Sequence, residues 1–141
     1  MDGNSYPHRT SDEIARHLLW AQVDDPVHYQ HRTIVRDGKR VSDTQPSEIL
    51  TGGKHVYIDL AHHAGTVLGQ REALTPTASL TRTDQGPAQR IDWILSTPNL
   101  VPAVRSVEVA ATEEVSQWTD HGFVIARFGL ADLKRILTPG H

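Results

Sequence analysis

Alternating hydrophobic and polar positions in the last third of the chain predict β-strands. The first strand runs over residues 90–96, and its apolar face carries Ile91, Trp93 and Leu95. Its other face carries Asp92, because successive side chains of a strand point to opposite sides. Alternating segments over 104–111 and 123–130 predict two further strands, and helical spacing of apolar residues over 131–137 predicts a terminal helix.

The first third of the chain combines helical and hairpin signals. Thr10 and Glu13 fit a capping box, and apolar residues follow at helical spacing, so a helix is predicted over 11–21. The segment 24–26, Asp-Asp-Pro, predicts a turn. The dipeptide 37–38, Asp-Gly, lies between two β-prone segments and favours a short exposed hairpin with a type I′ turn.

The middle of the chain is less regular. Pro46 suits the first turn of a brief helix over 47–50 that ends at the two glycines 52–53. Residues 56–60 fit either a short strand or the approach to a helix that carries Leu60, Ala64 and Leu68. Residues 69–86 are polar and rich in threonine, which predicts a long loop. The expected fold class is therefore α+β, with a mostly antiparallel sheet and flanking helices in one domain, 1–141.

Composition narrows the classes of protein that remain. A chain of 141 residues is long enough to bury the core of one domain but short for a two-sheet enzyme. The net charge of −3 does not support a strongly cationic nucleic-acid surface, although it leaves a local basic patch open. The absence of cysteine excludes disulfides, a thiolate metal site and a cysteine nucleophile.

Hydropathy gives an expectation about location. No apolar run approaches the ~20 residues of a membrane span, and the first residues lack the charged and apolar regions of a signal peptide. No membrane partner is therefore expected, and the chain as given is expected in the cytoplasm. A targeting segment that originally preceded Met1 would change this expectation, so localisation is left open.

Candidate chemistry lies in the strand-rich part of the chain. Asp92 falls inside the first predicted strand, and Asp120 and His121 come directly before the strand that begins at residue 123. An acid in one strand and an Asp-His pair at the mouth of its neighbour can meet at the edge of a sheet. Carboxylates placed in this way orient a histidine for work on a phosphate or an ester.

These motifs resemble a known family. The run Arg-Ile-Asp-Trp-Ile-Leu-Ser at 90–96, followed by Thr-Asp-His at 119–121 and an apolar strand, is similar to the C-terminal end of the endonuclease/exonuclease/phosphatase superfamily, metal-dependent phosphohydrolases related to DNase I. The run Met-Asp-Gly-Asn-Ser at 1–5 resembles the family's Gly-Asp-x-Asn motif with methionine in place of the first glycine. Short signals at 59–61 and 75–77 fall where the family has similar ones. The resemblance spans almost the whole chain but only about half of the family's catalytic domain.

The resemblance implies a fold, a reaction and a role for each site residue. The fold would be half of a DNase I-like four-layer α/β sandwich, and the reaction would be hydrolysis of a phosphate ester of unidentified class. Asp2 would hold or deprotonate the attacking water, and Asn4 would contact the phosphate or the metal. His121 would stabilise or protonate phosphate oxygens, with Asp92 orienting its imidazole. Mg²⁺ or Mn²⁺ would be bound by Asp2, Asn4 and Asp120, since a hard ion prefers oxygen ligands.

The chain departs from the family in ways that bear on activity. The family's first half supplies an asparagine, a glutamate metal ligand and often a histidine or tyrosine, and none of these is matched here. The metal would then be held weakly, and one face of the sheet would be bare. A second copy of the chain, a separate N-terminal half, or repacking of 22–45 and 69–88 would cover that face. Thr119 replaces the commoner serine, and Gly122 with Phe123 replaces a residue-proline pair.

Structural interpretations stand beside the catalytic ones. Asp92 would be satisfied by a salt bridge with Arg90 or Arg105, since a half-buried acid is costly unless paired. Asp120 and His121 would form a plain turn, and Asp2 and Asn4 would be terminal loop residues. The chain would then be a non-catalytic family remnant that acts as a binding or assembly module.

The remaining histidines and tryptophans have simpler interpretations. His62 and His63 favour a surface pair on a helix rather than a metal site. His8, His28 and His31 could together bind a transition metal only if the loops that carry them converge. The three tryptophans are expected in the core or at an interface rather than as a platform for base stacking. They are Trp20, Trp93 and Trp118.

Overall fold

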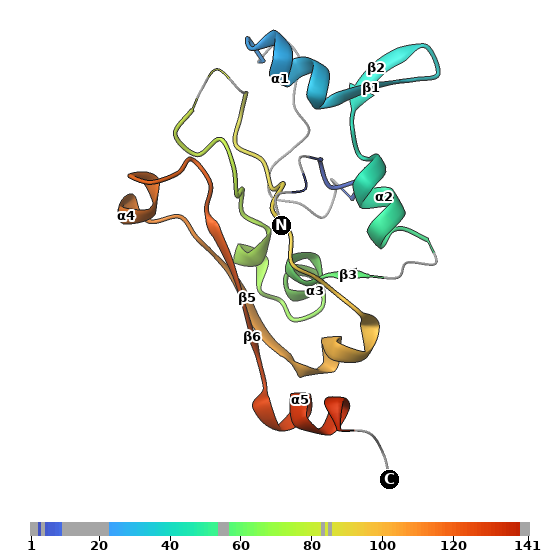
Figure 1. The fold of residues 1–141 in the computed structure, drawn as a ribbon, viewed down its shortest axis with the longest axis vertical. Helices are drawn as coiled ribbons and strands as arrows, with labels where there is room; N and C mark the ends of the chain where they lie inside the picture. Colours follow the sequence, from blue (N-terminus) through green and yellow to red (C-terminus); the bar gives the residue numbers. More distant parts are fainter. Residues whose placement is uncertain are drawn as a thin grey trace.

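The computed structural model describes residues 3, 5–9, 23–53, 57–82, 84 and 86–138. Within these ranges the predicted α+β class is confirmed, because short helices alternate with antiparallel strand pairs (Figure 1). The prediction of one sheet is wrong, since the described strands form three separate two-stranded sheets. Figure 1 shows α1 and the β1–β2 hairpin at one end of the molecule and α5 at the other. The helix predicted over 11–21 lies outside the described residues.

The predicted hairpin is present as β1 (Thr33–Arg36) paired with β2 (Lys39–Ser42). Asp37 and Gly38 have φ angles of 53° and 73°, so both central residues of the turn are left-handed. A type I′ turn requires this conformation at both positions, and aspartate and glycine tolerate it best. The dipeptide therefore determined the local structure.

The turn predicted at residues 24–26 is instead the start of a helix, α1 (Pro26–His31). The Asp25 side chain accepts hydrogen bonds from the amides of Val27 and His28, and Pro26 occupies the first turn. Aspartate at the N-cap and proline at the first helical position are strong start signals for a helix.

The middle of the chain contains two further helices. The brief helix predicted around 47–50 is α2 (Gln45–Thr51), and it ends at Gly52 as expected. Both interpretations of residues 56–60 hold in succession among the described residues, because β3 (Ile58–Asp59) leads directly into α3 (Leu60–Thr66). The loop predicted over 69–86 contains the 3₁₀ helix η2 (Arg71–Leu74).

The main core lies between α3, η2 and the longest strand pair. The strands are β5 (Val104–Ala110) and β6 (Phe123–Phe128), which pair antiparallel and confirm two of the predicted strands. The buried residues of this core are Leu60, Ala61, Ala64, Ala73, Val104 and Val107. Burying a leucine or valine side chain contributes about 1.5–3 kcal/mol, so this cluster fixes β5 and β6 against α3.

The strand predicted over 90–96 forms hydrogen bonds to another strand only at its end, where β4 (Leu95–Ser96) pairs with β3. Ile91 and Trp93 are each only 2% exposed, so the predicted alternation is present over residues 91–94. It breaks at the end of the segment, where Leu95 is half-buried and Ser96 is buried. Before β4, a buried side chain also holds this segment. The Thr77 hydroxyl accepts hydrogen bonds from the amides of both Ile91 and Asp92 at 3.0 Å.

The last elements are η3 (Pro98–Ala103), α4 (Glu113–Ser116) and α5 (Leu130–Leu137). The terminal helix is confirmed, although β6 ends at Phe128, before the predicted end of that strand at residue 130. None of the helices in the described ranges has the length and apolar character that crossing a bilayer requires.

Candidate acid–histidine site

The structure brings Asp92 and His121 into hydrogen-bond contact. The distance between His121 Nδ1 and Asp92 Oδ2 is 2.8 Å, and the two side chains are 30% and 15% exposed, respectively. Because a carboxylate can only accept, this contact places the proton on Nδ1 and leaves Nε2 for other partners. The two residues approach from segments 29 positions apart in sequence, as the motif spacing predicted.

The salt bridges considered for Asp92 are not formed. Arg90 pairs with Asp59, and Arg105 pairs with Asp132. Asp92 is therefore oriented by the imidazole rather than by a guanidinium group.

Thr77 forms hydrogen bonds to the segment that carries Asp92 and to the turn that carries His121. Its hydroxyl binds the amides of Ile91 and Asp92, and its carbonyl accepts a 2.7 Å hydrogen bond from the amide of Gly122, next to His121. Thr77 is completely buried. The sequence placed Thr77 in a family-like signal at 75–77 but gave it no role, because its partners are distant in sequence.

The turn that carries His121 has two further supports. The Thr119 hydroxyl accepts from the amide of His121 at 3.1 Å, and the amide of Leu80 donates to the Asp120 carbonyl at 3.2 Å. At Gly122, a Cβ atom would lie only 2.9 Å from Val109 Cγ1. The glycine that departs from the family pattern is thus required by close packing on β5.

Asp92 and His121 line an open cleft of about 470 Å³. Its other walls include Trp93, Ile94, Trp118 and Phe123. Trp118 is 84% exposed and Phe123 58% exposed, so two aromatic side chains stand uncovered beside the pair. Trp93 is a core residue, whereas for Trp118 only the interface interpretation remains, as a prediction. Trp20 lies outside the described residues. A second cavity, of about 400 Å³, also reaches His121 from the side of α4.

The described residues do not form a complete metal site. No three histidine, aspartate or glutamate side chains converge within the described ranges. Asp120 is half-buried, and Asp2 and Asn4, the other two predicted ligands, lie outside the described residues. Of the three predicted ligands, the described part of the chain therefore contains only Asp120.

Gly3, which lies between those two positions, is described. Its amide donates to the Ile91 carbonyl at 2.8 Å. A Cβ atom on Gly3 would lie 2.9 Å from the Trp93 ring. The third residue of the N-terminal motif therefore packs against the segment that carries Asp92.

The other histidines do not gather into a metal cluster in the described ranges. His8 Nδ1 lies 2.8 Å from the Ser47 hydroxyl, and the Arg9 guanidinium approaches His62 Nδ1 at 3.4 Å. Burial lowers the pKa of His8, and the neighbouring Arg9 lowers it further. Burial also lowers the pKa of His63. These side chains take part in packing and polar contacts around α2 and α3.

A buried ion pair lies close to the acid–histidine pair in sequence. Asp59 Oδ2 accepts from Arg90 Nη2 at 2.8 Å, and the Arg90 side chain is only 2% exposed. The other oxygen of Asp59 caps α3 by accepting from the amides of Ala61 and His62. The sequence analysis predicts no contact between Asp59 and Arg90, which are 31 positions apart.

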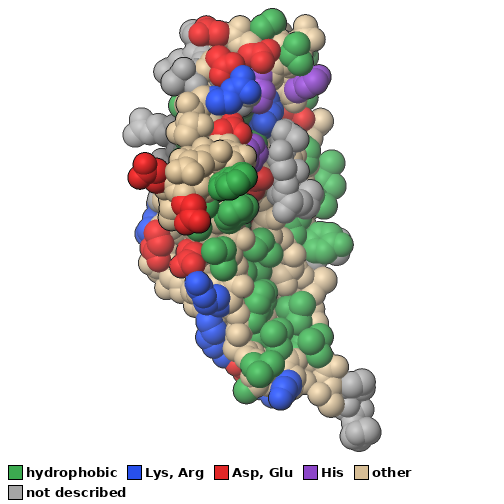
Figure 2. Space-filling model, turned by 60° about the vertical axis from the view of Figure 1, so that its left-hand side comes forward, with side chains coloured by type: hydrophobic (Ala, Val, Ile, Leu, Met, Phe, Trp, Pro, Cys, Tyr) green, Lys and Arg blue, Asp and Glu red, His purple; other side chains and the backbone are tan. Residues whose placement is uncertain are grey.

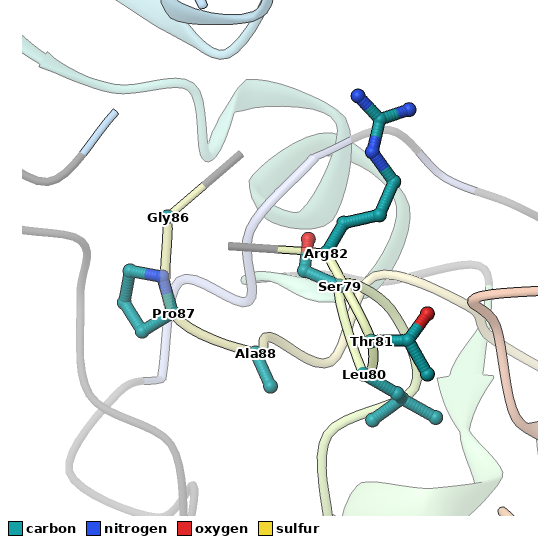
Figure 3. A pocket seen from close by; sticks show the side chains of 7 residues that line it. All are labelled: Ser79, Leu80, Thr81, Arg82, Gly86, Pro87 and Ala88. Atoms are coloured by element: carbon teal, nitrogen blue, oxygen red, sulfur yellow. The ribbon is translucent and has the colours of Figure 1, made fainter. Parts of the chain in front are cut away.

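Another pocket, of about 350 Å³, lies within the loop 79–88 (Figure 3). Figure 3 shows the segment 79–82 facing the segment 86–88, with the Arg82 side chain extending away from them. Arg82 pairs with Asp84 through a 3.1 Å contact from Nε to Oδ1. No acid or histidine lines this pocket among the described residues, so its walls do not supply acid–base chemistry.

Comparison of the chain with protein-family models, with curated proteins and with solved structures gave no match.

Proposed function

We propose that this chain is a phosphoesterase of the endonuclease/exonuclease/phosphatase type, in which His121 acts on the phosphate ester and Asp92 orients its imidazole. The proposal is carried by one observation, the 2.8 Å contact between His121 Nδ1 and Asp92 Oδ2 at the wall of an open cleft. An imidazole held from behind by a carboxylate presents its second nitrogen in a fixed direction. A phosphate ester in the cleft would meet that nitrogen.

The pair supplies two kinds of assistance to ester hydrolysis. When His121 is protonated, Nε2 donates a hydrogen bond to a non-bridging phosphate oxygen and offsets the negative charge that develops there. The same proton can pass to the leaving oxygen as the ester bond breaks. Asp92 keeps the ring in place through its contact with Nδ1. The incoming water supplies the oxygen that replaces the leaving group. The proton that this water loses passes to solvent, and Nε2 regains a proton from solvent, so the imidazole returns to its starting state.

The metal dependence of this reaction is a separate part of the proposal. Family resemblance predicts Mg²⁺ or Mn²⁺, whereas Asp92 is engaged by His121 and the described ranges contain no converging set of three ligands. A complete site would need Asp2 and Asn4, or groups from a second polypeptide, beside Asp120. We therefore assign no step to the ion. The expected behaviour is weak metal affinity, visible as activity that rises with Mg²⁺ into the millimolar range and disappears with a chelator.

The experiment compares hydrolysis of nitrophenyl phosphate mono- and diesters by the wild type, D92A and H121A at saturating Mg²⁺. Loss of a general acid–base group lowers the rate by roughly 10²–10⁴-fold, so both variants should fall by this factor. H31A is the matched control, because His31 is exposed on α1, away from the residues that line the cleft. Activity in D92A and H121A equal to that of H31A would remove the catalytic proposal.

The second candidate is a non-catalytic binding or assembly module. Its support is the exposure of Trp118 and Phe123 at the cleft, because exposed aromatic side chains are typical of interfaces. This candidate predicts a folded wild type without phosphatase or phosphodiesterase activity at any metal concentration. In that case Asp92 and His121 would only hold the turn before β6.

A further inference from the structure

The two edges of the β5–β6 hairpin differ in how their backbone groups are satisfied. On the outer edge of β5, the Gln70 side chain behaves like a short piece of strand. Its Nε2 donates to the Arg105 carbonyl at 2.9 Å, and its Oε1 accepts from the Val107 amide at 3.1 Å. A side-chain amide thus covers the middle of this edge and blocks the approach of another strand.

The outer edge of β6 has no such cover. Val107 lies opposite Ala126, and the Val107 amide points to Gln70 rather than to β6. Opposite residues of an antiparallel pair either exchange both hydrogen bonds or exchange none. The amide and carbonyl of Ala126 therefore point away from β5, and those of Val124, two residues earlier, do the same.

No partner for these backbone groups is present in the described part of the chain. The amide of Gly122, on the same edge, is the exception, because it donates to Thr77. Beyond Gly122 the edge is open along Val124 and Ala126. Figure 2 shows hydrophobic side chains gathered over the lower half of the molecule, where Figure 1 places β5, β6 and α5.

We propose that the open edge of β6 pairs antiparallel with β6 of a second copy of this chain, about a two-fold axis. The result is a continuous four-stranded sheet in the order β5, β6, β6 of the partner, β5 of the partner. A two-stranded sheet is marginally stable in water, and three or more strands with an apolar face are needed for independent stability. A two-fold axis closes the assembly after two copies, which is the commonest arrangement of homo-oligomers.

The side chains of β6 favour self-pairing. In the register centred on Ile125, the two Ile125 side chains face each other, and Val124 faces Ala126 of the partner subunit. The one charged residue of the strand, Arg127, faces Phe123 of the partner subunit, so no like charges are opposed. Within its own chain Arg127 is paired with Glu108 at 2.8 Å. The edge carries no lysine of the kind that prevents edge-to-edge association in many sheet proteins.

This pairing would also change the candidate cleft. Phe123 and Val124 line the cleft that contains Asp92 and His121, and the second strand would run beside both. Arg127 of the partner subunit would stand at the cleft margin next to Phe123. The pairing itself does not depend on the proposed phosphoesterase activity, because it follows from the backbone of β6.

The test is the mass of the chain in solution, measured by light scattering and by sedimentation from about 1 to about 100 µM, since assembly depends on concentration. The wild type should reach twice the 15.7 kDa mass of one chain. A126P removes the outward amide without breaking the ladder to β5, because proline is tolerated on a sheet edge. It should remain monomeric and folded, with an unchanged far-ultraviolet circular dichroism spectrum.

A second variant keeps the test informative if A126P fails to fold. I125K lies opposite Glu108 within the chain, so the monomer tolerates the charge, whereas the dimer would oppose two ammonium groups. I49K makes the same isoleucine-to-lysine change on α2, where Ile49 is 76% exposed, and this matched control should still dimerise. A wild type that stays monomeric up to about 100 µM, or an I125K variant that dimerises as well as I49K, would overturn the proposal and assign the edge to a different polypeptide or to none.

Discussion

Two carboxylates of this protein each pair with a basic side chain, but one pair is buried and the other lies at a cleft. Asp59 is sealed in the interior, with Arg90 on one oxygen and the first turn of α3 on the other. Asp92 is two residues beyond Arg90 but stands at the wall of an open cleft, in contact with His121. Both pairs join segments about thirty residues apart, so sequence separation does not distinguish them.

The two pairs differ in whether a ligand from solution can reach the basic side chain. The Arg90 side chain is 2% exposed, so a ligand from solution does not reach it. The His121 side chain is 30% exposed, and its second nitrogen is not used by Asp92. A buried pair holds the chain together, whereas a pair at a cleft can exchange protons with a ligand. We therefore assign Asp59–Arg90 to the fold, whereas Asp92–His121 is the pair on which the proposed chemistry depends.

The largest expected effect is on stability, from R90A. Removing one partner of a buried ion pair leaves the other charge unpaired and costs about 3–5 kcal/mol. Urea unfolding followed by circular dichroism measures this loss. R105A is the control, because Arg105 pairs with Asp132 at the surface and such exposed pairs contribute about 0–1 kcal/mol. Equal unfolding midpoints for R90A and R105A would contradict the structural role of Arg90.

An intermediate effect is expected from T77V, which keeps the shape of the side chain but removes its hydroxyl. The amides of Ile91 and Asp92 then lose their acceptor, and an unsatisfied buried donor costs about 1–3 kcal/mol. Activity should fall as well, because Thr77 positions the segment of Asp92. T75V is a matched control, since the Thr75 hydroxyl donates only to the nearby Glu72 carbonyl. If T77V were as stable and active as T75V, Thr77 would not brace the pair.

The smallest effect is a pH dependence from histidines outside the cleft. Burial lowers the pKa of His8 and of His63 below 6.5 in the folded chain. Below pH 6.5 these histidines take up protons in the unfolded chain but not yet in the folded chain. The free energy of unfolding is therefore highest above pH 6.5 and decreases as the pH falls from 6.5 to the lowered pKa values. The urea midpoint should decrease between pH 7.5 and 5.5, and the decrease should be smaller in H8Q than in the wild type. The same pH profile in both proteins would assign the dependence to other groups.

Local features of the fold were predictable because short-range chemistry determines them. The Asp37-Gly38 turn, the glycine end of α2 and the alternation of Ile91 with Trp93 all appear as the sequence indicated. The start of α1 was missed, although Asp25 and the proline after it are ordinary helix-start signals. The same residues, Asp25 and Pro26, occur in turns and at the starts of helices, and the sequence analysis predicts the turn.

Features that depend on distant partners were predicted less well. The segment 90–96 was expected to be a full strand, but β4 covers only Leu95–Ser96, and the amides of Ile91 and Asp92 donate to the Thr77 hydroxyl. Whether strands join one sheet or several depends on which edges are covered, and Gln70 covers β5 from 35 positions away. The contact of Asp92 with His121 was predicted from motif order and spacing and is present. Its predicted setting, the edge of one sheet, is wrong, because the segment 90–96 pairs with β3 whereas β6 pairs with β5. The roles of Asp2 and Asn4 stay predictions, since both lie outside the described residues.

The most direct test of the division between the two pairs is a titration of the His121 ring resonances with inorganic phosphate, followed by nuclear magnetic resonance. It needs no turnover and therefore applies even if the chain alone is inactive. We predict a saturable shift of these resonances in the wild type and in D24N, where the exposed Asp24 is changed, and at least about tenfold weaker binding in D92N, corresponding to about 1.4 kcal/mol. Resonances that do not move with phosphate in a folded wild-type chain, or that move equally in D92N, would contradict the assignment of Asp92 and His121 to chemistry.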